Sequence, residues 1–157
     1  MRGVYSVTFD QQTIAAASGD YDLFEIVPAD DKPVEVVALS LGNKSEVGDA
    51  QDEMLAYSIV RGNTTSSNGT ATTPQLLDPS DPAASFTAET VGSTPATAGT
   101  SVTLLADTFN VRAGLMLVLP PEMRPKVSQA NTGLYVRLTT AVADDLTLSG
   151  TLWVREL

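Results

Sequence analysis

Apolar residues in this chain recur at every second position within short runs, and this period of two limits the fold more than any other feature. Tyr5, Val7 and Phe9 alternate with small polar residues near the start, and the alternation returns in residues 134–138 and 146–157. Such a pattern predicts strands with one buried face, whereas a helix would place its apolar residues three and four positions apart. The sequence therefore predicts an all-β protein.

Turn-forming residues separate these runs and set the number and spacing of the strands. Glycine, proline, asparagine and aspartate occur between them, a spacing typical of sandwiches and barrels. We expect strands at residues 5–9, 23–27, 34–41, 54–61, 86–91, 102–106, 109–112, 115–119, 134–138 and 146–157. The sequence does not alternate strands with helices, so we do not expect a parallel sheet. We predict a single domain, residues 1–157, folded as an antiparallel β-sandwich of jelly-roll or immunoglobulin-like type.

Three further segments carry local expectations. Residues 62–74 and 92–100 consist of small Ser, Thr and Gly-rich sequence and are predicted to form long exposed loops, the first with a possible hairpin at Asn68-Gly69. Residues 45–53 are expected to form one helical turn or an irregular loop. Gly150, inside the last strand, predicts a bulge or a close approach of neighbouring groups.

The chain contains no cysteine and no histidine, and this removes most catalytic designs. Disulfides, thiolate metal sites and every triad built on histidine are excluded. A pair of carboxylates could still hydrolyse a glycosidic bond, but only one Trp, four Tyr and four Phe are available as a platform for a sugar. We expect no enzymatic activity, no catalytic residues and no cofactor.

Nineteen acidic against nine basic residues give a net charge of −10. An acidic surface repels phosphate backbones, so we expect no nucleic-acid partner. The charge either keeps an apolar-rich chain soluble or attracts a basic partner or cations. The start of the chain lacks the apolar core of a signal peptide, and no run is long enough to span a bilayer, so we expect synthesis in the cytoplasm and no membrane partner.

Acidic clusters in the predicted loops are the candidates for a cation site. They are Asp30-Asp31, Asp49 with Asp52 and Glu53, Asp78 with Asp81, and Asp144-Asp145. None has the spacing of a calcium-binding EF-hand loop. Aspartate also forms turns through hydrogen bonds to nearby backbone. We therefore predict turn-forming roles and no metal site.

Two segments are candidates for an interface with another protein. Trp153, Arg155 and Leu157 lie on the last strand, where they either form an exposed stripe or are buried between sheets. Pro120, Pro121 and Arg124 belong to a proline-dense connector, which is either an extended arm or a stiff surface loop.

Several stretches together resemble small virion proteins that are encoded beside the major capsid gene of tailed bacteriophages. The likeness covers most of the chain, and no single motif in it is diagnostic. It rests on residues 5–9 (YSVTF), 23–29 (LFEIVPA), 47–55 (VGDAQDEML), 59–63 (IVRGN), 77–84 (LDPSDPAA), 109–114 (FNVRAG) and 148–152 (LSGTL).

The resemblance implies a head decoration, or cement, protein on the capsid surface of a virion, with the major capsid protein and further copies of itself, as a homotrimer, as partners. It supplies no catalytic residues. The alternative is a tail or adsorption module that binds a receptor or glycan through loops such as residues 62–74.

Overall fold

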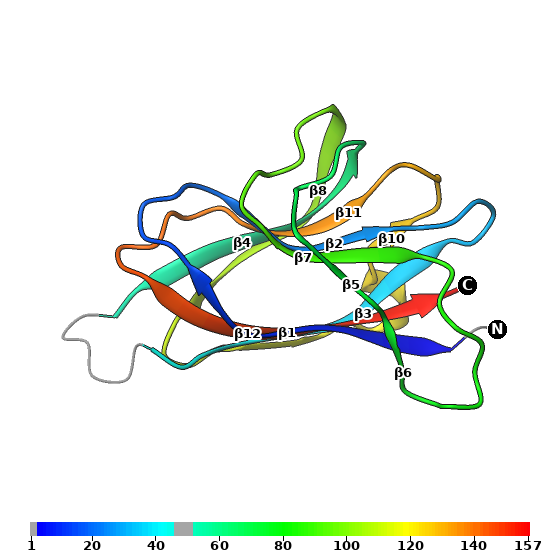
Figure 1. The fold of residues 1–157 in the computed structure, drawn as a ribbon, viewed down its shortest axis with the longest axis horizontal. Coiled ribbons are helices and arrows are strands. Elements are labelled where there is room, and N and C mark those ends of the chain that lie inside the picture. Colours follow the sequence, from blue (N-terminus) through cyan, green and yellow to red (C-terminus); the bar gives the residue numbers. More distant parts are fainter. Residues whose placement is uncertain (1–2, 46–51) are drawn as a thin grey trace.

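Two antiparallel sheets packed face to face form the molecule, and the predicted β-sandwich is confirmed (Figure 1). The structure is a computed structural model and describes residues 3–45 and 52–157. We call the sheet that holds the two chain ends sheet A, with the order β10-β3-β12-β1-β6 and with β9 also paired to β3. Sheet B has the order β5-β7-β2-β11-β4-β8.

The strand bounds follow the chain order, with one short 3₁₀ helix, η1, between β9 and β10. They are β1 Val4–Ile14, β2 Tyr21–Val27, β3 Val34–Asn43, β4 Met54–Asn63, β5 Thr70–Thr72, β6 Gln75–Leu76, β7 Thr87–Gly92, β8 Gly99–Asn110, β9 Leu115–Val118, η1 Pro121–Met123, β10 Lys126–Val127, β11 Leu134–Leu138 and β12 Leu146–Glu156.

Eight of these strands have the connectivity of a jelly roll. Taken in chain order as β1, β2, β3, β4, β8, β9, β11 and β12, they form the neighbouring orders β1-β12-β3-β9 and β2-β11-β4-β8. The first strand thus lies beside the last, and the second beside the second last, which is the nested arrangement of two Greek keys. The jelly-roll form of the prediction is confirmed.

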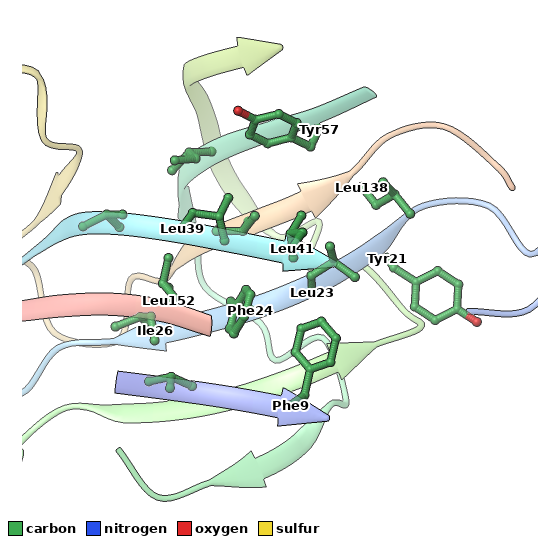
Figure 2. Close-up of a cluster of buried hydrophobic side chains, with 14 of the residues drawn as sticks. Phe9, Tyr21, Leu23, Phe24, Ile26, Leu39, Leu41, Tyr57, Leu138 and Leu152 are labelled. Atoms are coloured by element: carbon green, nitrogen blue, oxygen red, sulfur yellow. The ribbon is translucent and has the colours of Figure 1, made fainter. Parts of the chain in front are cut away.

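Alternating side chains from both sheets fill the space between the layers (Figure 2). Phe9 of β1 and Phe24 of β2 come from opposite sheets, and their ring centroids lie 5.1 Å apart. Tyr5 packs edge-on against Phe86 and donates a hydrogen bond of 2.9 Å to the carbonyl of Pro82, which fixes the long connection between β6 and β7. The alternation in the sequence therefore reports the buried face of strands such as β12 and the first half of β1.

Two strands extend far beyond the sequence pattern. The predicted strands at 102–106 and 109–112 are wrong as separate elements, since β8 continues from the first into the start of the second and ends at Asn110, where the chain turns. Most of β8 is exposed at the edge of sheet B, so polar Asp107 and Thr108 do not interrupt it. In the same way β1 continues to Ile14 through four exposed residues.

The prediction for Gly150 is confirmed as a close approach. A side chain there would come within 2.7 Å of the Phe9 ring and 2.9 Å of Leu41. A bulge occurs as well, although it lies in the partner strand: β1 shifts register between Phe9 and Gln12, opposite Gly150.

Loops of the chain itself cover part of the outer face of sheet B. Arg137 makes two hydrogen bonds to the buried carboxylate of Asp22, at 2.6 and 3.0 Å, and a third to the carbonyl of Ala96. The backbone amide of Ala96 in turn donates to Asp22. Ala96 packs with Val60 and Tyr135 in a second small cluster. The residues that follow β7 are thereby fixed onto the sheet.

The predicted loop at 62–74 is largely exposed, but it is anchored at its centre. Ser67 is buried and donates two hydrogen bonds to Glu25, and Glu89 accepts bonds from Ser66 and Gly69. Its last part forms strand β5 along β7. The expected helical turn at 45–53 lies mostly outside the described residues.

Candidate interaction surface

A buried carboxylate on the outer face of sheet A gathers three cationic side chains. Glu35 of β3 is only 4% exposed. Its Oε1 accepts a hydrogen bond of 2.8 Å from Arg124 and one of 3.2 Å from Arg155, and Lys126 lies 3.4 Å from its Oε2. We call Arg124, Lys126 and Arg155 the cationic cluster. It unites the two segments that the sequence offered separately as candidate interfaces.

The cluster keeps Glu35 ionised. Burial acts to raise the pKa of Glu35, but hydrogen bonds and positive charge from Arg124 and Lys126 outweigh it, so the pKa lies below its ordinary value of 4.5. One carboxylate does not neutralise three cations, so positive charge remains on this part of an acidic protein. The cluster can therefore attract an acidic partner.

Trp153 lies beside this cluster, half-exposed on the outer face of β12. Leu152 and Val154 are fully buried, whereas Thr151, Trp153 and Arg155 on the other face are only partly buried, so the alternative of a strand buried on both faces is wrong. On this face, Trp153 is opposite Ser6 on one side and Ala38 on the other, and Ala38 is opposite Val118 of β9. An apolar row thus crosses three strands of sheet A.

Val118 and Met116 extend this row to the edge of the sheet and are 65% and 64% exposed. We call Ala38, Met116, Val118 and Trp153 the tryptophan patch. Exposed apolar groups together with tryptophan and arginine are typical of the centre of protein interfaces.

The proline-dense connector is a compact loop, so its reading as an extended arm is wrong. Residues 121–123 form η1, the amide of Met123 donates to the carbonyl of Pro120, and Nε of Arg124 donates to Leu119. Pro120 and Pro121 are exposed in this turn, next to the patch at Val118.

The last residue, Leu157, is 44% exposed and donates its amide to Pro33. The structure thus brings Arg124 and Arg155 together at Glu35 and places Trp153 in the apolar row beside them. The other three candidate residues lie at exposed positions in the same two segments; they are Pro120, Pro121 and Leu157.

Sequence reasoning missed Glu35, Met116 and Val118. Glu35 could have been found, because a carboxylate inside the apolar run of residues 34–37 needs a buried partner. Met116 and Val118 have no such signal, since exposure at the edge of a sheet depends on the strand order.

The turn-forming prediction is confirmed at Asp78, which accepts two hydrogen bonds from Ser80. Asp145 and Glu53 instead accept hydrogen bonds from the amides of Ala16 and Ala143, and Asp52 pairs with Arg112, so these carboxylates join segments that are distant in the sequence. Across residues 3–45 and 52–157 no group of three potential ligands could hold a metal ion. Asp49 lies outside the described residues. Within those same ranges, no helix has the length and apolar character needed to cross a membrane.

Comparison with known proteins adds no relative from which a role could be transferred. No family model, curated protein or solved structure matches the chain. The function is therefore argued from the jelly roll and from the surface formed by the tryptophan patch and the cationic cluster.

Proposed function

We propose that this chain is a structural protein of a tailed-bacteriophage head, a cement protein that binds the major capsid protein on the outer surface of the shell. It acts as a binding module and not as an enzyme. The observation that supports this most is the tryptophan patch, an apolar surface on sheet A with arginine side chains beside it.

The sheet holds the patch in place before any partner binds. Trp153 sits on the central strand β12, between β1 and β3, and Arg124 and Arg155 are fixed by Glu35. A surface whose side chains are already ordered loses little conformational entropy on binding. Such a surface suits a protein that must attach to many equivalent sites on a shell.

Stabilisation of the shell then follows from mass action. A protein that binds only the assembled lattice lowers the free energy of the assembled state, and each bound copy adds to the effect. Self-association as a trimer would place three patches around a symmetry axis of the shell and increase the avidity.

The experiment mixes the purified protein with empty shells assembled from the major capsid protein of the same genome. We expect co-sedimentation at a copy number fixed by the lattice, and an increase in the temperature at which the shells disassemble. Light scattering of the free protein measures whether it is a trimer in solution.

Variants locate the contact. Val118→Asp places a charge in the tryptophan patch and should weaken shell binding about tenfold or more, a loss of about 1.4 kcal/mol. Leu77→Asp is the matched control, because Leu77 is 56% exposed and follows β6 at the opposite edge of sheet A. Equal binding by both variants contradicts the patch as the contact. Binding to glycans with no affinity for shells supports the adsorption module instead.

A further inference from the structure

A trough separate from the tryptophan patch runs along the edge of sheet B. Two adjoining depressions of ≈ 440 and ≈ 400 Å³ lie between β8 and the chain at residues 121–132, and both are lined by Arg61. Val102 and Leu104 of β8 and Met123 of η1 supply exposed apolar surface to it. Arg61 bridges the two sheets by donating a hydrogen bond of 2.7 Å to the carbonyl of Lys126.

The strand that forms one wall is a free sheet edge. β8 has twelve residues and pairs with β4 on one side, while no strand of the described ranges pairs with it on the other. Proteins usually protect long edges with lysine, proline, bulges or a covering segment. β8 contains neither lysine nor proline and has Asp107 as its only charge, and its two register shifts are the only one of these devices that the strand itself carries. The pairing of β8 with β4 shifts register at Leu104 and near Thr100, and both of these residues line the trough.

Charge selects the kind of partner that fits this edge. Arg61, Arg124 and Lys126 line the trough. Glu122 is the only carboxylate among the lining residues, and the buried Glu35 pairs with Arg124 and Lys126, so three cations still exceed two carboxylates. This positive group is unusual on a protein of net charge −10. Two copies that paired through their β8 edges would bring two such groups close together, and like charges at an interface are costly. The trough therefore favours an acidic partner over a second copy in edge-to-edge contact.

We propose that the trough binds an extended acidic segment of another protein, which lies along β8. The exposed main chain of β8 offers hydrogen bonds to the segment, apolar side chains of the segment contact Val102, Leu104 and Met123, and its carboxylates pair with Arg61 and Lys126. This site has no residue in common with the tryptophan patch, although it shares Arg124 and Lys126 with the cationic cluster, and it stands whether or not the chain binds a capsid.

The probe is a capped eight-residue peptide of alternating glutamate and valine, tested by fluorescence anisotropy and by hydrogen exchange of the whole protein. We expect binding that protects the amides of residues 99–106. Lys126→Glu should weaken it about tenfold. Lys44→Glu, an equal charge change at a site where Lys44 contacts Gln11, should leave it unchanged.

A second pair of variants tests the apolar wall. Leu104→Asp should lower the affinity for the peptide, and Leu77→Asp should leave it unchanged. If Leu104→Asp still binds shells, this site is distinct from the tryptophan patch. The proposal is overturned if the wild-type protein does not bind the peptide, or if Lys126→Glu and Lys44→Glu have equal affinity. It is also overturned if a lysine–valine peptide or a thymidine oligonucleotide binds as tightly.

Discussion

Glu35 shows at the residue scale how one carboxylate organises a surface. It holds Arg124, Lys126 and Arg155 within hydrogen-bond or ion-pair distance while almost fully buried itself. Removing the charge from such a centre leaves cations without compensation, which costs more than the net value of the bonds themselves. The position is therefore important both for stability and for the orientation of the two arginines.

Glu35→Gln is expected to lower the free energy of unfolding at pH 7 by about 1–3 kcal/mol in urea denaturation. Because the folded pKa of Glu35 is depressed below 4.5, its contribution is fully present above that value and disappears as pH falls through the folded pKa. The difference between wild type and variant should therefore shrink in acid. Glu122→Gln, at an exposed position in η1, is the control and should change little.

Glu25, on the other sheet, should respond to pH with the opposite sign. Burial raises its pKa above 4.5 against the hydrogen bonds from Ser67, and the charges of Glu89 and Asp22 add to the rise. At this site the folded state then binds more protons than the unfolded state just above pH 4.5, so Glu25 contributes added stability as the pH falls from neutral. Glu25→Gln should abolish this gain, and exposed Asp30→Asn should retain it. An identical pH dependence in wild type and Glu25→Gln would contradict the assignment.

At the scale of the elements, the close packing between β1 and β12 provides a direct test of the sandwich. Gly150→Ala is expected to lower the free energy of unfolding by about 1–3 kcal/mol, because the new methyl group meets the buried ring of Phe9 and the side chain of Leu41. Gly42→Ala on the adjacent strand is the control, since no atom lies within 4 Å of the added carbon. Similar thermal midpoints for both variants would mean that Phe9 does not pack over Gly150.

The strands themselves were predictable from the sequence, and their ends were not. Alternation identifies the core positions of β3, β4, β11 and β12, because each buries one face against the opposite sheet. It fails along β8 and in the second half of β1, where solvent on both faces removes the pattern. Short strands such as β10 carry no local signal and exist only because a neighbouring strand pairs with them.

The candidate surface was predictable in part for a related reason. Residue type alone draws attention to Trp153, Arg155 and Arg124. The contacts of the two arginines with Glu35 could not be predicted, because Arg124 and Arg155 lie 89 and 120 positions from Glu35 in the chain. Local sequence contains no information about such pairs. The charged residues inside apolar strands, Asp22, Glu25 and Glu35, were the available signal, since each needs a partner from elsewhere in the fold.

At the scale of the whole molecule, the charge distribution is uneven. Arg61 joins the cationic cluster through Lys126, so four of the nine basic residues lie together, while the chain as a whole carries −10. Excess negative charge destabilises the compact state by self-repulsion, and salt screens that repulsion over about a Debye length. Attraction between the cationic groups and an acidic partner is screened by the same salt.

Added sodium chloride is therefore expected to act in opposite directions on folding and on binding. Between about 10 mM and about 300 mM salt, the free energy of unfolding at pH 7 should rise by about 1 kcal/mol in urea denaturation, whereas the affinity for the glutamate–valine peptide should fall. Near the sequence pI of ≈ 4.2 the net charge vanishes, so the stabilising effect of salt should vanish there too. A fall in stability with salt at pH 7 would show that local ion pairs such as Asp22–Arg137 outweigh the repulsion of the whole molecule. If the affinity for the peptide does not change with salt, contacts with Val102 and Leu104, and not charge, hold the segment in the trough.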